Sequence, residues 1–368
     1  MRAIIVSRLY ADAATRGKLR ALAGLGCTIG AVVPASGQPA PGDPPRATTF
    51  GDDAGVRIFP VAVRGSEQEL IWDKKALRRA LADFRPQLVQ LEEEPSSRIA
   101  ASVMRAAKRL DFRVTAFSSD ALPPRLPLLA RLRRERVLRR AAGLIGESTL
   151  ALDHLSRKHS AKPKAAIPQV GVTPPLLTGS LARPGLTIGF VGRLVPERGL
   201  DLLFRACVQL SDAWWIQVAG TGPAQEELEA LAERLGIAAR VTWHGALPRQ
   251  ALSALWPGLD CAAFPSRTTP RWVESRGRAV LDAMANGLPV VVSASGALPE
   301  LVGTAGRVVP EEGVDELAGV LRSFARDPDR RSALGVEARR RVLAEYTDES
   351  IAQRTLAFWR VVTGSANP

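Results

Sequence analysis

Cysteine, histidine and aromatic residues are scarce in this chain, and long hydrophobic runs are lacking. The 368 residues include three cysteines, Cys27, Cys207 and Cys261, which stand apart with no CxxC pair. This scarcity excludes a disulfide scaffold and a cysteine-ligated zinc cluster, and it predicts small buried core residues in a reducing compartment. The three histidines are also scattered, without the spacing typical of metal ligands. We therefore expect no metal site.

The apolar segments are too short to span a membrane. A spanning helix needs roughly 18 to 20 apolar residues in succession, and no segment of the chain approaches that length. The first ten residues, MRAIIVSRLY, lack the apolar core and small-residue cleavage site of a secretory signal. We expect them to contain the first strand, and we expect the protein to be cytoplasmic.

The composition is that of a globular protein with an uneven charge. Hydrophobic residues make up 46% of the chain and charged residues 24%, which excludes a disordered or fibrous protein, and the length predicts two domains. Residues 1–175 hold 29 Lys/Arg and 16 Asp/Glu, a net charge of +13, whereas residues 176–368 hold 21 of each. A basic first half indicates an acidic partner: nucleic acid, an anionic membrane or a phosphorylated acceptor. A general richness in arginine is the alternative explanation.

Short β-branched runs alternate with amphipathic stretches, a pattern that predicts parallel sheets covered by helices. The first half has six predicted strands: 3–7, 28–33, 57–61, 88–91, 113–117 and 143–146. Its predicted helices include 74–84, 97–110 and 149–158, and the proline-rich segment Ser36–Arg46 is expected to be a loop. A second α/β series begins with LTIGFVG at residue 186 and continues through WWIQVAG, VTWHG, LDCAAFP and PVVVSA.

Prolines and glycines interrupt the pattern around residues 173–185, and we place the domain boundary there. The expected domains are residues 1–175 and 176–347. Two helices, 328–344 and 348–362, close the chain, and we expect the last one, about 348–368, to pack back on the first domain. Doubly wound domains bind ligands at the carboxyl ends of their strands.

The most informative segment is residues 265–303, PSRTTPRWVESRGRAVLDAMANGLPVVVSASGALPELVG. An apolar strand leads into a loop, and a helix of about ten residues starts at Gly277. Its first amide groups form an anion site. Glu274 precedes the helix, and Asp282 lies in it; carboxylates accept strong hydrogen bonds from hydroxyl groups of sugars.

This segment resembles the signature of family 4 retaining glycosyltransferases, in which seven residues separate two acidic ones. The resemblance extends to IGFVGRLVPERGL, AGTGP and VTWHGALP in the second domain, and in patches to QLEEEP and PQVGV in the first. It implies the GT-B fold, in which two Rossmann-like doubly wound domains face a central cleft. It also implies a nucleotide diphosphate sugar as donor and neither a metal nor another cofactor.

The resemblance implies a role for each matched residue. Arg193 and Arg198 would bind the donor diphosphate, and Glu274 would hold the hydroxyls of the donor sugar. Asp282, where the family usually has glutamate, would hold the ribose. Donor-binding roles are further implied for Gly192, Gly220, Gly222, Trp243, His244, Gly245, Gly277, Arg278 and Ala279. Arg276 stands where an aromatic residue is common, so we expect either a changed donor pocket or a third cation for the phosphates there.

The acceptor side is less clearly marked. Arg16 and Lys18 occupy the loop where many relatives have paired glycines, and their function stays open. Glu93 and Glu94 follow a strand in the run Glu92–Glu94, and Asp120 follows the next strand. We expect one or more of these carboxylates to face the acceptor, with a solvated loop as the alternative.

The sequence therefore predicts a retaining glycosyltransferase that moves a hexose to a glycan, lipid-linked or small-molecule acceptor. UDP is favoured over GDP in the donor. A non-catalytic nucleotide-sugar-binding protein and a GT-B epimerase are the alternatives. Nucleic acid is not expected as a partner, because no aromatic residues are interspersed among the arginines of the basic segment Arg125–Arg140.

A basic helix is predicted within Arg125–Arg140, RLPLLARLRRERVLRR, which holds seven arginines and one glutamate. Such a helix is suited to the anionic inner face of the cytoplasmic membrane. The alternative is an ordinary solvated helix.

Overall fold

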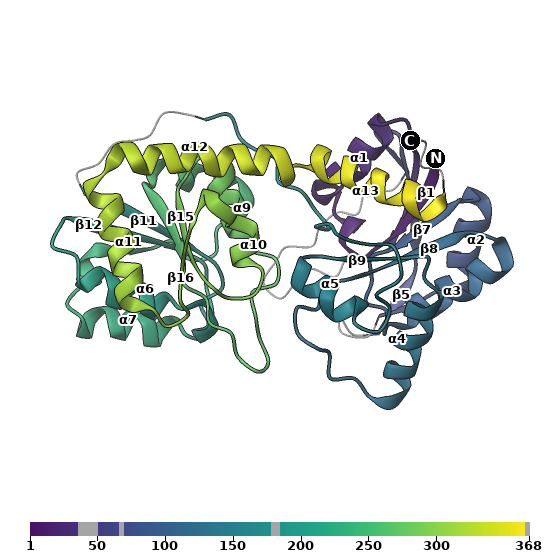
Figure 1. The fold of residues 1–368 in the computed structure, drawn as a ribbon, viewed down its shortest axis with the longest axis horizontal. Coiled ribbons are helices and arrows are strands. Elements are labelled where there is room, and N and C mark those ends of the chain that lie inside the picture. Colours follow the sequence, from purple (N-terminus) through teal and green to yellow (C-terminus); the bar gives the residue numbers. More distant parts are fainter. Residues whose placement is uncertain (36–50, 66–69, 178–184, 365–368) are drawn as a thin grey trace. The chain divides into compact units, whose positions relative to one another are not determined.

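The computed structural model describes residues 1–35, 51–65, 70–177 and 185–364. The expected loop Ser36–Arg46 lies outside these ranges. The chain divides into two compact units (Figure 1). Unit 1 comprises Met1–Gly171 and Asp348–Pro368, and unit 2 comprises Val172–Thr347.

Unit 1 is built on a sheet of eight strands in the order β10-β9-β8-β7-β1-β2-β4-β3, parallel except for the pair β3–β4. The strands of this sheet are β1 Arg2–Val6, β2 Thr28–Pro34, β3 Gly51–Asp53, β4 Val56–Val61, β7 Leu88–Leu91, β8 Arg113–Ser118, β9 Gly143–Gly146 and β10 Lys164–Ala166, and a separate pair is formed by β5 Val63–Arg64 and β6 Ile71–Trp72. The helices are α1 Gly17–Gly24, α2 Lys74–Phe84, α3 Arg98–Leu110, α4 Leu128–Arg140, α5 Thr149–Ser156 and α13 Asp348–Thr363.

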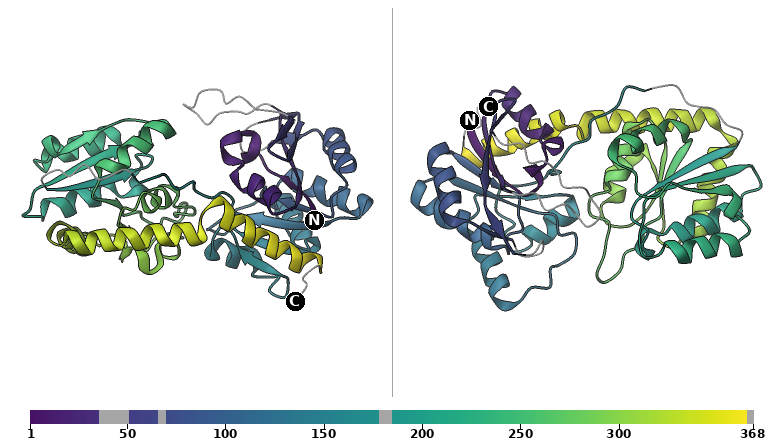
Figure 2. Two further views of the ribbon diagram at one scale, coloured as in Figure 1. Left: turned by 90° about the horizontal axis from the view of Figure 1, so that it is seen from above. Right: turned by 180° about the vertical axis from the view of Figure 1, so that it is seen from behind.

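Alternation along the strands places two apolar layers on this sheet. Ile4 and Val6 of β1 point to the face covered by α2, α3, α4 and α5, while Ala3 and Ile5 point to the face covered by α1 and α13. Both faces are thus buried, as a parallel sheet requires. Helix α13 lies against α1, although more than 300 residues separate them in sequence (Figures 1 and 2).

Unit 2 has a six-stranded parallel sheet in the order β13-β12-β11-β14-β15-β16. Its strands are β11 Leu186–Val191, β12 Trp214–Ala219, β13 Val241–Trp243, β14 Cys261–Phe264, β15 Val290–Ser293 and β16 Arg307–Val309. Its helices are α6 Leu200–Val208, α7 Gln225–Arg234, α8 Arg249–Leu255, α9 Arg278–Ala285, α10 Leu298–Val302, α11 Val314–Arg326 and α12 Pro328–Glu345. Helices α6, α7 and α11 cover one face, and α9, α10 and α12 cover the other.

The predicted strands and helices in the described ranges are confirmed within one or two residues. No sequence pattern predicted the short strands β3, β5, β6, β10 and β16, of two or three residues each. Each is too short to show a periodic pattern and exists through pairing with a neighbour. The three cysteines are buried and unpaired, as predicted.

Candidate active site

The two central strands of unit 2, β11 and β14, mark the point where the order of strands reverses. The chain goes from β11 outward to β12 and β13, and from β14 outward to β15 and β16 in the opposite direction. Ligands of such sheets bind outside the carboxyl ends of the strands at this point. Arg193 and Arg198 lie in the loop after β11, and Glu274 lies in the loop after β14. The fold therefore brings the residues predicted to bind the diphosphate and the donor sugar to one edge of one sheet.

Glu274 and Arg198 form an ion pair, although 76 residues separate them in sequence. The other oxygen of Glu274, Oε1, accepts a hydrogen bond from the backbone amide of Gly277 at 3.2 Å. The Arg198 guanidinium also lies 5.3 Å from the centre of the Trp272 ring, within reach of a cation–π interaction. Glu274 is only 5% exposed, so the cation balances a carboxylate that would be costly to bury alone.

Arg193, the second residue predicted to bind the diphosphate, lies in the same loop as Arg198 and is exposed. The loop returns to α6 through Gly199, whose φ is +69°. A Cβ at this position would lie 1.9 Å from the carbonyl oxygen of Pro265, so only glycine fits. The loop after β11 is therefore held against the start of the loop after β14.

Helix α9 begins at Arg278, four residues after Glu274. Its N-cap residue is Gly277, with φ +54° and no side-chain cap. Arg278 and Ala279 are its first residues, so its positive dipole end lies beside the Arg198–Glu274 pair. Asp282, one turn further, is half-buried and pairs with Arg278 at 3.3 Å. Asp282, the residue predicted to bind the ribose, is thus already paired with an arginine on its own helix.

Two glycine-rich loops approach each other more closely than side chains would allow. A Cβ on Gly220 would lie 1.8 Å from the carbonyl oxygen of Gly192, and one on Gly222 would lie 2.1 Å from that of Leu194. The amide of Gly220 donates to the carbonyl of Gly245 at 2.8 Å. These contacts join the loops after β11, β12 and β13 into one backbone surface.

The side chains of two predicted base-binding residues, Trp243 and His244, are engaged within unit 2. The ring of Trp243 packs edge-on against Phe204, 6.1 Å away and at 87°, and contributes to the core. His244 Nε2 lies 2.7 Å from Gln217 Oε1 on β12. Both rings therefore have partners within unit 2.

Arg267 holds the loops at this edge of the sheet together, although no sequence pattern marks it. It pairs with both carboxylate oxygens of Asp201 at 2.6 Å, with Glu312 at 2.5 Å, and donates to the carbonyl of Pro196 at 2.8 Å. These hydrogen bonds raise the pKa of its guanidinium. Its partners are 66 and 45 residues away, so no local pattern marks it.

In unit 1, Glu94 and Asp120 lie together at the carboxyl ends of β7 and β8. Glu94 accepts hydrogen bonds from Ser118 Oγ at 2.8 Å and from the Ser119 amide at 2.9 Å. Burial and the negative charge of Asp120 raise the pKa of Glu94 to about 7. Burial also raises the pKa of Asp120. Two adjacent carboxyl groups with raised pKa values are typical of a functional site.

The other predicted acceptor-side residues are deeply buried. Arg16 is fully buried and bonds to the carbonyl of Tyr10 and to Asp53. Lys18 Nζ lies 2.5 Å from Glu92 Oε1, with both side chains almost fully buried. Glu93 pairs with Arg8 at 2.8 Å and is 4% exposed. The structure therefore gives these residues contacts that hold unit 1 together, and leaves Glu94 and Asp120 as the more accessible carboxylates.

In the part of the chain that the structure describes, no group of three or more His, Cys, Asp or Glu side chains could hold a metal ion. Within the same residues, no helix is both long and apolar enough to cross a membrane.

Comparison with known proteins gives a consistent result. Residues 181–341 match the family model described as glycosyl transferases group 1. A D-inositol 3-phosphate glycosyltransferase from Mycobacterium sp. (strain KMS) is 32% identical over 325 residues, which cover 76% of this chain and 72% of that protein. A GDP-mannose-dependent alpha-(1-6)-phosphatidylinositol monomannoside mannosyltransferase from Mycolicibacterium smegmatis is 36% identical over 156 residues, 40% of this chain. That match spans 41% of the mannosyltransferase, less than half its length.

Solved structures resemble the whole chain. Sucrose-phosphate synthase from Thermosynechococcus elongatus gives a TM-score of 0.73 at 18% identity and covers both chains completely. An Anabaena protein solved in complex with UDP gives a TM-score of 0.69 at 16% identity, covering 98% of this chain and 100% of its own. These likenesses confirm the predicted fold of two Rossmann-like domains.

Proposed function

Since the chain belongs to the glycosyl transferases group 1 family, we propose that it is a retaining glycosyltransferase that uses a nucleoside diphosphate hexose. One observation supports this most strongly. The Arg198–Glu274 ion pair lies at the N-terminus of α9, on the carboxyl edge where β11 and β14 meet. This arrangement combines a cation, helix amides and a carboxylate, which are the groups that a diphosphate sugar needs.

In the proposed reaction, the protein stabilises the departing diphosphate electrostatically. Arg193, Arg198 and the first amides of α9 would face the diphosphate, whose negative charge grows as its bond to the sugar breaks. Glu274 would accept hydrogen bonds from the sugar hydroxyls. The acceptor hydroxyl would attack from the same face that the diphosphate leaves, and a phosphate oxygen would take its proton. We propose no metal in this scheme, because arginines supply the positive charge.

The donor base would be bound mainly by backbone groups of Trp243, His244 and Gly245, because both rings are engaged elsewhere. Backbone contacts discriminate weakly between bases. The sequence favours UDP, whereas the mannosyltransferase relative is named as dependent on GDP-mannose. A thermal-shift screen of UDP, GDP and their hexose conjugates would identify the donor, since a ligand of the folded state raises its stability.

On the acceptor side, we propose that Asp120 and Glu94 bind the attacking hydroxyl of a glycan, lipid-linked or small-molecule acceptor. They are the predicted acceptor-side carboxylates without a strong ion pair in the described part of unit 1. A carboxyl pair that holds one proton can both accept and donate a hydrogen bond.

The decisive test replaces Arg198. Arg198→Ala should lower kcat/KM at least ~100-fold, the typical loss when a charge-stabilising group is removed. Arg198→Lys should retain part of the activity, since it keeps the charge but loses the planar geometry. Arg340→Ala, an exposed arginine of α12, serves as the matched control and should leave activity unchanged. Turnover of the Arg198→Ala protein at the wild-type rate would refute the diphosphate assignment.

Activity assays with EDTA and anomer analysis by NMR test the remaining parts of this proposal. We expect full activity in the chelator and a product with the anomeric configuration of the donor. An inverted or epimerised product would contradict retention. Tight donor binding without turnover across an acceptor panel would instead indicate a nucleotide-sugar-binding protein.

We also propose that unit 1 associates reversibly with the anionic cytoplasmic membrane surface. Helix α4 exposes Arg136, Arg139 and Arg140 to solvent, and each basic residue near an anionic surface contributes roughly 1 kcal/mol. The protein should co-sediment with anionic vesicles at low salt and be released as salt rises. Absence of binding at low salt would leave α4 as a solvated helix.

A further inference from the structure

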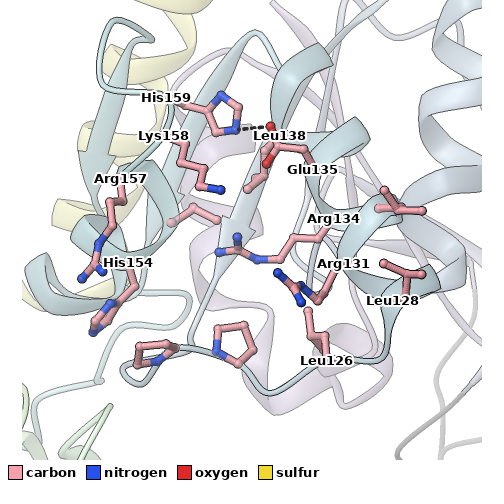
Figure 3. A pocket seen from close by; sticks show the side chains of 14 residues that line it. Leu126, Leu128, Arg131, Arg134, Glu135, Leu138, His154, Arg157, Lys158 and His159 are labelled. Atoms are coloured by element: carbon pink, nitrogen blue, oxygen red, sulfur yellow. Dashed lines mark ion pairs between the residues drawn. The ribbon is translucent and has the colours of Figure 1, made fainter.

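A pocket of about 450 Å³ lies between α4, α5 and the loop that precedes α4 in unit 1 (Figure 3). Its volume is within the range of roughly 300 to 1,000 Å³ found for small-molecule sites. The proposed donor site is in unit 2, and none of its residues contributes to this pocket. The pocket is therefore separate from the proposed donor site.

Three cationic side chains point into the pocket. Figure 3 shows the guanidinium groups of Arg131 and Arg134 on α4 directed toward the same space as the ammonium group of Lys158. Among the described residues, none of the three has a hydrogen-bond or ion-pair partner. Arg131 and Lys158 are therefore available to an anion, while the charge of Arg134 also acts on Asp120.

The single acidic residue of the lining does not cancel this charge. Glu135 Oε1 lies 3.4 Å from Nε2 of His159, at the upper end of the pocket in Figure 3. His159 is 90% buried at its side chain, and its Nε2 makes no hydrogen bond among the described residues. Glu135 thus faces an imidazole rather than the three cations.

Most of the remaining lining is apolar. Besides His154 and Arg157, it consists of prolines and leucines: Pro123, Pro124, Leu126, Leu128, Leu132, Leu138 and Leu155. Leu128 and Leu132 are 67% and 59% exposed, and Leu129 beside them is 76% exposed. Exposed leucines that continue from a pocket are unusual on a protein surface and indicate an apolar ligand or partner.

Cations beside leucines fit an anion that carries a hydrocarbon chain. Arginine pairs and a lysine suit phosphate oxygens, to which guanidinium groups donate two parallel hydrogen bonds. The lining contains no Phe, Tyr or Trp, the large aromatic side chains on which nucleotide bases stack most strongly. We propose that the α4–α5 pocket binds the phosphate group of a phosphorylated lipid, with the chain lying along Leu128 and Leu132.

The pocket lies beside the carboxyl pair of unit 1. The positive charge of Arg134 acts on Asp120 and opposes the effect of burial on its pKa. A lipid phosphate held by Arg134 would place its attached groups near Asp120. The binding itself is independent of glycosyl transfer, because no residue of unit 2 takes part.

The test measures binding to the full chain by isothermal titration calorimetry at fixed salt. The probes are inorganic phosphate, hexyl phosphate, dodecyl phosphate and the uncharged dodecyl maltoside, each below its micelle concentration. Dodecyl phosphate should bind at least about tenfold more tightly than hexyl phosphate, since more apolar surface is buried, and at least about tenfold more tightly than the maltoside. Equal affinities for inorganic and dodecyl phosphate would overturn the lipid assignment, and so would equal affinities for both dodecyl compounds.

Variants locate the site. The double variant Arg134→Gln/Lys158→Gln should weaken dodecyl phosphate binding by about tenfold or more, and Leu132→Gln should weaken dodecyl phosphate but not inorganic phosphate. Arg78→Gln/Arg79→Gln, at two exposed arginines of α2 outside the pocket lining, is the control and should bind as the wild type does. Circular dichroism verifies that each variant is folded. Unchanged binding by the folded pocket double variant would refute the site, and nucleotide binding measured in parallel would show separately whether the donor assignment holds.

Discussion

At the scale of single residues, the charge of Glu94 should link the stability of unit 1 to pH. Burial and Asp120 raise its pKa to about 7, so the folded state holds a proton that the unfolded chain releases above about pH 4.5. The stability that this proton confers is present below that pH and is lost as pH rises toward 7. Glu94→Gln should therefore raise the Tm more at pH 8 than at pH 5. Thermal unfolding at both pH values checks this, with Glu337→Gln, an exposed carboxylate, as the control.

Also at this scale, Lys18 should matter for stability rather than for acceptor binding. Removing one partner of a buried ion pair leaves an uncompensated charge and costs about 3–5 kcal/mol. We expect Lys18→Met to lower the free energy of unfolding in urea by this amount, because the ammonium group that lies 2.5 Å from Glu92 in the wild type would be gone and the Glu92 carboxylate would remain buried. The double variant Lys18→Met/Glu92→Gln should recover part of it. A stable Lys18→Met protein with a raised KM for acceptor would instead restore its role on the acceptor side.

At the scale of elements, the loops after β11 and β12 form one surface only because glycines allow their close approach. Gly220→Ala places a Cβ 1.8 Å from the Gly192 carbonyl at a φ of +146°, so the two loops must separate. We expect a loss of at least ~1 kcal/mol in stability and weakened nucleotide binding in a thermal-shift assay. Gly319→Ala in α11, where nothing lies within 4 Å of the added Cβ, should instead stabilise by roughly 0.5–1 kcal/mol. Wild-type nucleotide binding by Gly220→Ala would contradict the role of this surface.

At the scale of the whole molecule, the end of the chain belongs to the unit formed by its beginning. Trp359 of α13 is fully buried in unit 1, and its indole Nε1 donates to Gln90 on β7 at 2.6 Å. Trp359→Ala should cost unit 1 about 3–5 kcal/mol. Hydrogen exchange should become faster in β1, β7 and α1, while β11 and β14 of unit 2 keep their protection. Equal acceleration in both units would show that they unfold as one.

The sequence by itself determined the α/β architecture, the order of the main elements and the family. Those features depend on local information: alternating apolar runs for strands such as 186–191, a glycine before α9, and a contiguous motif from Glu274 to Asp282. Residues close in sequence remain close in space, so their spacing alone carries the meaning.

Only the tertiary structure decided which of the marked residues are available for chemistry. Arg16, Lys18 and Glu93 stand at positions that suggest a site, yet long-range pairing with Asp53, Glu92 and Arg8 buries them. Arg267 and the α4–α5 pocket were likewise beyond the reach of sequence patterns. Their geometry comes from segments that meet only on folding, and the burial that sets the pKa of Glu94 arises in the same way.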